Sequence, residues 1–253
     1  MSAGAVRAII ERRILVNYRV DAEALRGILP APFRPVLVDG SGIAGICLIR
    51  LGRIRPAGVP TALGMTTENA AHRVAVEWDT ADGPVTGVFI PRRDTSSRLV
   101  SLVGGRAFPG WHHRAAFNVS EGGGRYRVGM RSLDGTASVA VAASAVDRPM
   151  AGSVFASVDE ASAFFRRAPV GYAPTPRSGE FDGVALSTCG WGMHALRVES
   201  VASSWFDDTQ CFPAGSAVLD SAFLMEHLDT RWTPLPALVA ATTGAETVTP
   251  VLL

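Results

Sequence analysis

The sequence is dominated by short runs of β-branched and aromatic residues that are separated by Gly- and Asp-containing turns. Runs of this length and composition indicate strands, and the dipeptides between them favour tight hairpins, so the chain is restricted to a mainly antiparallel sheet. The run RYRVGMR alternates strictly, as expected of a half-buried strand. We expect strands over residues 13–20, 43–51, 73–78, 85–90, 115–119, 125–131 and 137–146, with strand character resuming over 184–201.

Few helices are expected, and each is recognised by its capping residues. Asp21 can cap a helix that stops before Pro30. Asp94 or Thr95 can open a second helix that runs to residue 102. Ser157 precedes a third helix that Pro169 closes, and the Glu three residues after this serine completes a capping box.

No composition shift divides the chain into separate units, and we expect one domain over residues 1–253. Residues 171–183 are rich in Gly and Pro and indicate a surface loop, and residues 240–253 indicate a loose tail. The predicted fold class is α+β and mainly antiparallel β, with a closed β-barrel or cone and a few peripheral helices.

Charge and hydropathy exclude several classes of partner. The net charge of +1 gives no reason to expect nucleic acid. No apolar stretch approaches the roughly 20 residues that cross a bilayer, and charges interrupt the N-terminal segment, so we expect no membrane contact and a cytoplasmic location. Residues 1–55 carry nine Arg against four acids, whereas residues 201–253 carry one Arg against six acids. The two ends could pair within a subunit or across a homo-oligomer.

The chain contains no lysine, so all 24 of its Lys and Arg residues are arginines. No side-chain amine exists to form a Schiff base with a carbonyl substrate or a pyridoxal cofactor. We expect no cofactor. The five histidines show no metal-ligand spacing, and we expect no metal.

Two other motifs are weak. The letters GSGIAG at 40–45 match a dinucleotide fingerprint, but the β-type run ICLIRL follows where a helix is needed, so a glycine-rich hairpin is the better interpretation. Cys189 and His194 could pair as nucleophile and base, although a buried thiol beside a strand histidine is the simpler alternative.

The segment WHHR at 111–114 carries two adjacent histidines. Neighbouring side chains of a strand point to opposite faces, so at most one of them faces a given cavity. If His113 faces inward, Ala115 and Phe117 do too, and an apolar wall surrounds one imidazole. The alternative is a histidine that simply lies in the core.

Three segments, in order, resemble the acetoacetate decarboxylase superfamily. NYRVDAEALRGILPAPF at 17–33 is similar to its strand that ends in Tyr-Arg and leads into a short helix. TTENAA at 66–71 is similar to its Thr-Glu segment, and GGRAFPGWHHRAA at 104–116 resembles the stretch that runs into two adjacent catalytic lysines. SSWFDDTQCFPAGSAVLDSAFL, further along, resembles a bacterial branch of the superfamily. The resemblance implies a lysine-free, divergent member.

The resemblance also implies positions for site residues. Glu68 stands where the family has its pocket glutamate, His113 stands at the Schiff-base lysine, and Arg114 stands at the neighbouring lysine that activates it. The family's substrate-binding arginine falls on Glu11 or Arg12, depending on a one-residue register. A decarboxylase that forms an iminium is therefore excluded, while the pocket could be retained.

We expect acid–base proton transfer on a small carbonyl or keto compound, of the kind found in secondary metabolism: enolisation, dehydration, aldol-type closure or cyclisation. His113 would act as base and then as acid, with Glu68 as general acid. Arg114, or Arg106 nearby, would hold a carboxylate or enolate; His113 and Arg114 can both face inward only across a bulge. The expected substrate-binding residues are Arg114, Arg106, Arg12, Met65, Phe89, Trp111 and Phe117.

An alternative function belongs to another class. A chain that kept the barrel and lost catalysis would be a non-catalytic small-molecule-binding protein, and loss of the nucleophilic lysine favours it. Retention of Glu68 and of a titratable group at position 113 favours an enzyme. In both cases the partner is a small carbonyl or carboxylate compound.

Overall fold

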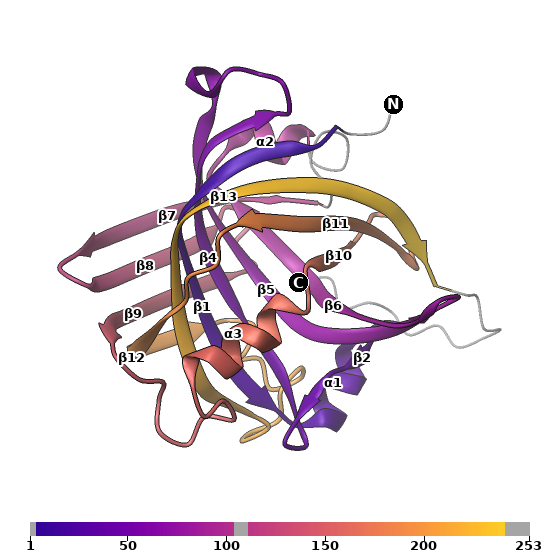
Figure 1. Cartoon of the computed structure of the whole chain (residues 1–253). Helices are drawn as coiled ribbons and strands as arrows, with labels where there is room; N and C mark the ends of the chain where they lie inside the picture. The colour runs from indigo at the N-terminus through magenta and orange to yellow at the C-terminus, as the bar shows by residue number, and fades with distance from the viewer. Residues whose placement is uncertain (1–3, 104–110, 241–253) are drawn as a thin grey trace.

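A computed structural model describes residues 4–103 and 111–240. Its strands form one sheet in the order β11-β10-β6-β7-β8-β9-β12-β13-β1-β4-β5-β2, with β3 paired to β4 (Figure 1). The strands that form the main sheet are β1 Val6–Val20, β4 Ser41–Pro56, β5 Met65–Thr80, β6 Gly83–Thr95, β7 His113–Gly122, β8 Arg125–Ser132, β9 Ser138–Val146, β10 Val170–Pro174, β11 Glu180–Cys189, β12 His194–Ser203 and β13 Ala217–Val239. The shorter elements are β2 Arg34–Pro35, β3 Leu37–Val38, α1 Ala22–Ile28, η1 Thr61–Leu63, α2 Arg98–Val103 and α3 Val158–Arg166.

The sheet closes on itself twice, because β5 also pairs with β6 and β11 also pairs with β13. The first closure makes a ring of β6, β7, β8, β9, β12, β13, β1, β4 and β5. The second makes a smaller ring of β11, β10, β6, β5, β4, β1 and β13. The two rings therefore share five strands, and Figure 1 shows them as two lobes on either side of β1, β4 and β5.

The long strand β13 allows both closures. Its residues 222–224 pair with β12, and its residues 229–239 pair with β11, so two strands follow one another along a single edge. The expected closed, mainly antiparallel β architecture with a few peripheral helices is confirmed, with two connected rings instead of one regular barrel.

Alternate residues of the shared strands belong to different cores, as the period of a strand requires. Ile14 and Leu48 are buried in the larger core, together with aromatic side chains from several strands and the 203–212 segment. Leu15, Cys47 and Ile49 belong to a second core that α3 covers. Because both faces of these strands are buried, the strands read as nearly continuous apolar runs.

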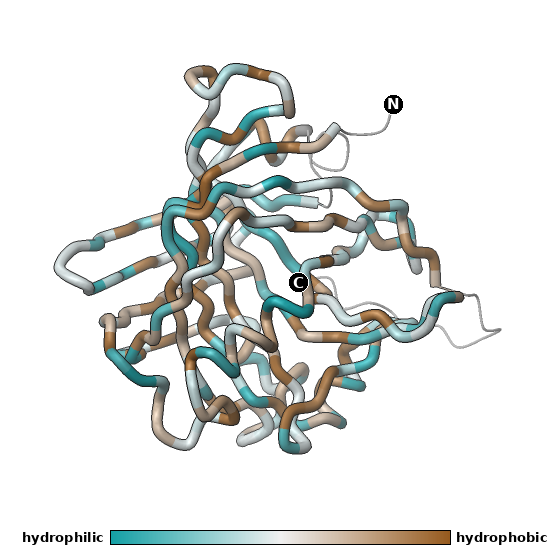
Figure 2. The backbone as a smooth tube through the Cα atoms, in the orientation of Figure 1, coloured by the Kyte–Doolittle hydropathy of each residue, from teal (hydrophilic) through white to brown (hydrophobic). Residues whose placement is uncertain are grey.

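The structure extends most of the predicted strands and confirms the hairpin interpretation of GSGIAG, since β4 begins at Ser41 directly after the turn. The alternation in RYRVGMR is also confirmed: its arginines are exposed, and its Val128 and Met130 are buried. Figure 2 shows hydrophilic and hydrophobic segments alternating along the projecting β7–β8 hairpin.

The first and third helices follow the predicted caps. The side chain of Asp21 accepts hydrogen bonds from the backbone amides of Glu23 and Ala24. Ser157 accepts from the amide of Glu160, whose carboxylate in turn accepts from the amide of Ala156.

Two predicted boundaries are wrong. Asp94 and Thr95 do not open a helix: their backbones pair with His113 and Arg114 of β7, and α2 begins only at Arg98. Residues 171–183 are not a surface loop, because β10 and β11 pair across a turn at 175–179. In both places tertiary strand pairing overrides the local turn and cap signals. The predicted tail falls almost wholly on residues 241–253, outside the described part.

No helix among residues 4–103 and 111–240 is long and apolar enough to cross a membrane.

Candidate functional site

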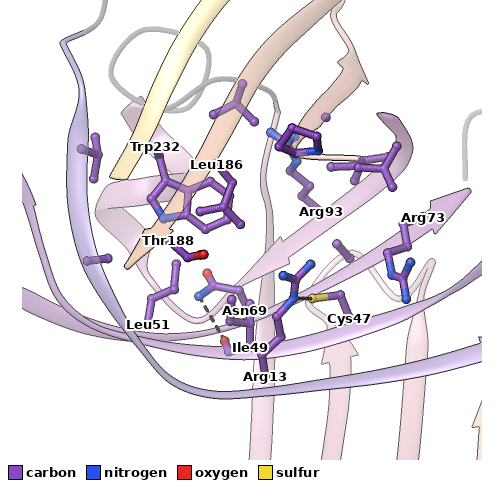
Figure 3. A pocket seen from close by; sticks show the side chains of 18 of the residues that line it. Arg13, Cys47, Ile49, Leu51, Asn69, Arg73, Arg93, Leu186, Thr188 and Trp232 are labelled. Carbon is purple, nitrogen blue, oxygen red and sulfur yellow. Dashed lines mark hydrogen bonds between the residues drawn. The ribbon is translucent and has the colours of Figure 1, made fainter. Parts of the chain in front are cut away.

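The smaller ring encloses a cavity of about 680 Å³ (Figure 3). Residues from all seven strands of this ring line it, and the end of α3 adds further residues. Its volume lies within the range of small-molecule sites, which are mostly apolar with a few convergent polar groups. The apolar walls include Val6, Ile49, Leu51, Ile54, Val88, Ile90, Leu186 and Trp232.

Arg73 on β5 is a buried cation of this cavity and forms no ion pair with a carboxylate in the described part of the chain. It is 4% exposed, and one Nη donates to the side-chain oxygen of Asn17. Its Nε has no hydrogen-bond partner, and its guanidinium lies 4.7 Å from the ring centre of Phe165. Burial lowers the pKa of Arg73 to about 10; Cys47 acts to raise this pKa, and the nearby charge of Arg13 acts to lower it. The guanidinium therefore stays charged at neutral pH without a counter-ion among the described residues.

Arg13 on β1 reaches the same region from the other side of Cys47. Its Nε donates to the sulfur of Cys47 at 3.4 Å, and no carboxylate of the described residues lies within ion-pair distance of it. The register explains this arrangement: Arg13 is opposite Ile49 and Arg73 is opposite Gly45, so Cys47 lies between them on β4. Figure 3 shows the three side chains together at the wall of the cavity.

Arg93 and Asp94 add charge to the side of the cavity formed by β6. Burial lowers the pKa of Arg93 to about 10, although the negative charge of Asp182 acts to raise it. Asp94 is held by two hydrogen bonds from Arg92, at 2.9 and 3.0 Å. Burial raises the pKa of Asp94 despite this pairing.

Two further polar groups face the cavity. The amide nitrogen of Asn69 donates to the hydroxyl of Thr67 at 2.8 Å, and its side-chain oxygen accepts no hydrogen bond from a described residue. His112 belongs to the lining of the cavity, and the adjacent His113 does not. The sequence pattern predicted that at most one of the two would face a cavity, and the structure assigns this position to His112.

Glu68 lies on the opposite face of β5, in a network of ion pairs. Its carboxylate accepts from Arg12 at 2.6 Å and from Arg50 at 2.6 Å. Both arginines also bind Glu121 of β7, Arg12 at 2.9 Å. Arg12 is 2% exposed, so the network holds a buried cation between two carboxylates. Neither Glu68 nor Arg12 lines the cavity.

His113 belongs to a second, separate network. Its Nδ1 lies 2.9 Å from Asp134, which Arg92 also contacts at 3.3 Å. Burial acts to raise the pKa of Asp134, but hydrogen bonds from Ser132, Thr136 and His113 outweigh it and hold that pKa far below its ordinary value. The described contacts do not bring His113 and Glu68 to one cavity, and their catalytic roles stay predictions.

None of the remaining predicted residues that the structure describes lines the cavity. Arg114 donates to the backbone oxygen of Ser96, and Arg106 lies outside the described residues. Met65 packs against the small apolar cluster of Val6, Ala8 and Ile54, whose members line the cavity. The three aromatic residues lie elsewhere: Phe89 and Phe117 pack in or against the larger core, and Trp111 is exposed.

Sequence reasoning missed the cavity arginines Arg13, Arg73 and Arg93. A signal was present for Arg13 and Arg73, since each adjoins apolar residues of a strand run, where charge is rare unless it serves a partner. A second signal was the pair Arg12-Arg13, of which one side chain must face each side of a strand.

Among the described residues, no group of three His, Cys, Asp or Glu side chains is placed to hold a metal ion.

The arrangement of two connected β rings with an interior cavity defines the class of protein as one with an acetoacetate decarboxylase-like fold. Solved structures of this class superpose over most of the chain. Acetoacetate decarboxylase from Legionella pneumophila matches with a TM-score of 0.60 at 14% identity, covering 94% of this chain and 88% of the other. An acetoacetate decarboxylase-like enzyme from Sphingomonas wittichii RW1 matches with a TM-score of 0.60 at 13% identity, covering 94% of both chains. The enduracididine biosynthesis enzyme MppR, complexed with pyruvate, matches with a TM-score of 0.59 at 13% identity, covering 96% and 93%.

The family model of DUF2071, described as an uncharacterized conserved protein, matches residues 8–175, and the chain belongs to that family. A search of curated proteins gives no match. The resemblance to the acetoacetate decarboxylase superfamily is thus confirmed at the level of the fold.

Proposed function

We propose that this protein is an enzyme that binds a small carbonyl carboxylate, such as a keto acid with an apolar body, and moves a proton on it. The observation that carries the proposal is Arg73: a buried guanidinium at the wall of the cavity, with an unused Nε donor and no acidic partner among the described residues. An isolated buried charge is costly, and a ligand carboxylate would compensate it through charge-assisted hydrogen bonds.

The rest of the cavity fits the remainder of such a substrate. Arg13 lines the same cavity and would share the carboxylate or stabilise an enolate oxygen. The apolar walls and the volume of about 680 Å³ leave room for a substrate larger than a three-carbon acid. The similar fold of MppR, which was solved with pyruvate, supports a keto acid as the first probe.

In this proposal His112, which belongs to the lining of the cavity, would move the proton. An imidazole can take a proton from the carbon next to a carbonyl and return it to the enolate, because it titrates close to neutral pH. The reaction would proceed through an enol or enolate with no imine, since the chain has no lysine. Both carboxylate oxygens of Asp94 accept hydrogen bonds from Arg92, so in this proposal Asp94 positions charged groups and does not transfer the proton.

Exchange of carbon-bound hydrogen provides a test that does not require the natural substrate. Pyruvate and phenylpyruvate are incubated with the protein in D₂O, and deuterium entry next to the carbonyl is followed by proton NMR. We expect exchange above the buffer rate, faster for phenylpyruvate. Arg73→Gln should weaken binding at least tenfold by calorimetry, and His112→Ala should abolish exchange while retaining binding.

Arg127→Gln is the matched control, because Arg127 is exposed on β8, a strand that contributes no residue to the lining of the cavity. Unchanged affinity in Arg73→Gln would overturn the carboxylate site. Binding without exchange in the wild-type protein would identify the non-catalytic binding protein instead. Exchange that depends on His113 or Glu68, and not on His112, would return the acid–base role to the residues that the family resemblance suggests.

A further inference from the structure

Three arginines lie side by side across neighbouring strands on the outer surface of the smaller ring. Arg7 of β1 is directly opposite Arg55 of β4 on one side and Arg231 of β13 on the other. Residues directly opposite each other in antiparallel strands point to the same face, with Cβ atoms about 5 Å apart. The three side chains therefore form a row across the sheet, which we call the arginine row.

No carboxylate compensates the arginine row within the described part of the chain. Arg7 and Arg231 are exposed, and their side chains make no hydrogen bond or ion pair with any described residue. Arg55 donates only to the backbone oxygens of Arg53 and Val59, at 2.9 and 3.2 Å. Like charges directly opposite in a sheet are destabilising, so this register maintains a repulsion that an anion would relieve.

The arginine row lines a groove and not a flat surface. The groove has a volume of about 460 Å³, and Ser187, Thr188 and Thr230 contribute to its lining. Asp229 also lies in it, but no ion pair joins this carboxylate to any of the three arginines. The hydroxyls of Ser187 and Thr230 already donate to the backbone oxygens of Arg231 and Ala8, so the guanidinium groups are the donors that this groove offers to phosphate oxygens.

We propose that this groove is a binding site for a phosphate-bearing small molecule, with a diphosphate group lying along the arginine row. Three guanidiniums in a line present donors over a length that one phosphate would not span and a diphosphate would. The concave form and the size of the groove favour a small ligand over the backbone of a nucleic acid or a membrane surface. The site is separate from the carboxylate-binding residues of the cavity, although both share Ala8, Ser187 and Thr188 in their walls.

The probe is inorganic pyrophosphate, titrated into the full-length protein by calorimetry in magnesium-free buffer at low salt. We expect saturable binding that is tighter than that of inorganic phosphate and that weakens as salt is raised. The double variant Arg7→Gln/Arg231→Gln should bind at least tenfold more weakly. Arg125→Gln/Arg127→Gln removes two exposed arginines of β8 and should leave the affinity unchanged.

Arg73→Gln distinguishes this site from the cavity, because it removes the cavity cation and leaves the arginine row intact. Pyrophosphate binding that persists in Arg73→Gln and is lost in the groove variant supports the proposal, whatever the outcome for keto acids. Equal loss in the two double variants, or loss in Arg73→Gln alone, would overturn it. Row-dependent binding to phosphatidylserine vesicles or to single-stranded DNA, without pyrophosphate binding, would reassign the row to a macromolecular surface. Melting temperatures without ligand show whether the variants fold, and relief of repulsion should leave Arg7→Gln at least as stable as the wild type.

Discussion

The Nε of Arg13 donates a hydrogen bond to the sulfur of Cys47 at 3.4 Å inside the cavity, with Arg73 on the other side of the same sulfur. This thiol therefore lies in a positively charged environment and is 7% exposed. The other two cysteines differ: Cys189 is exposed, and Cys211 is half-buried with its pKa raised by burial and by Asp208.

Labelling of Cys47 should depend on the charge of the reagent. Anionic iodoacetate is attracted by Arg13 and Arg73, whereas neutral iodoacetamide is not, so we expect the ratio of the two labelling rates to be several-fold higher at Cys47 than at Cys189. Peptide mass spectrometry measures both sites in one sample. Arg13→Gln should lower the ratio at Cys47 alone, and a keto acid that occupies the cavity should protect this thiol. A ratio at Cys47 no higher than at Cys189 would show that the guanidiniums do not reach an incoming anion.

Removing the buried charge of Arg73 should raise the free energy of unfolding and lower the affinity for a keto acid. Arg73→Met replaces an uncompensated cation with an apolar side chain that can still pack on Phe165. We expect the free energy of unfolding to rise by about 1–2 kcal/mol, because replacing buried charge with well-packed apolar side chains is often stabilising, while keto acid affinity falls. Denaturant unfolding with and without ligand measures both effects. A variant that is less stable than the wild type and binds equally well would make Arg73 a structural residue.

His72 should make stability depend on pH in mild acid. It is 2% exposed, its Nε2 lies 3.1 Å from the hydroxyl of Ser203, and burial, followed by the charge of Arg92, lowers its pKa to about 3. An unfolded histidine binds a proton near pH 6.5, so between that pH and about 3 the unfolded state holds more protons and stability falls as pH falls. The expected loss from this residue is about 1 kcal/mol for each pH unit below 6.5.

His72→Gln keeps a hydrogen-bonding side chain beside Ser203 and removes the titration. Its free energy of unfolding should therefore fall less steeply than that of the wild type between pH 6.5 and 4.5. Parallel slopes for the two proteins would mean that the imidazole titrates equally in the folded and unfolded states.

Arg12 should be a strong contributor to stability through its two carboxylates. Arg12→Met leaves Glu68 and Glu121 with only Arg50 between them, and loss of one partner from a buried pair typically costs about 3–5 kcal/mol. Arg127→Met, on an exposed face, should change stability by less than about 0.5 kcal/mol. Denaturant unfolding compares the two. A small effect at position 12 would indicate that water enters the network.

Much of the fold was accessible from the sequence. The turn dipeptides, the alternation in RYRVGMR and the caps at Asp21 and Ser157 are local signals, and the structure follows them. The absence of lysine is likewise a property of the sequence alone, and it excludes a side-chain Schiff base in any fold. The residues of the site could not be predicted in this way, because they are brought together by pairing between strands that are distant in the sequence.

Tertiary structure decided which side chains face the cavity. In β1, irregularities in the pairing with β4 fall between Arg7 and Ile9 and between Ile10 and Arg12, and a shift of one residue in register moves every following side chain to the other face. Arg12 therefore joins Glu68 on one side and Arg13 enters the cavity on the other, which no alternation pattern in the sequence could decide. The cavity is also formed by β11 and the second half of β13. These meet strands from the beginning of the chain because β13 is long enough to pair first with β12 and then with β11 along the same edge.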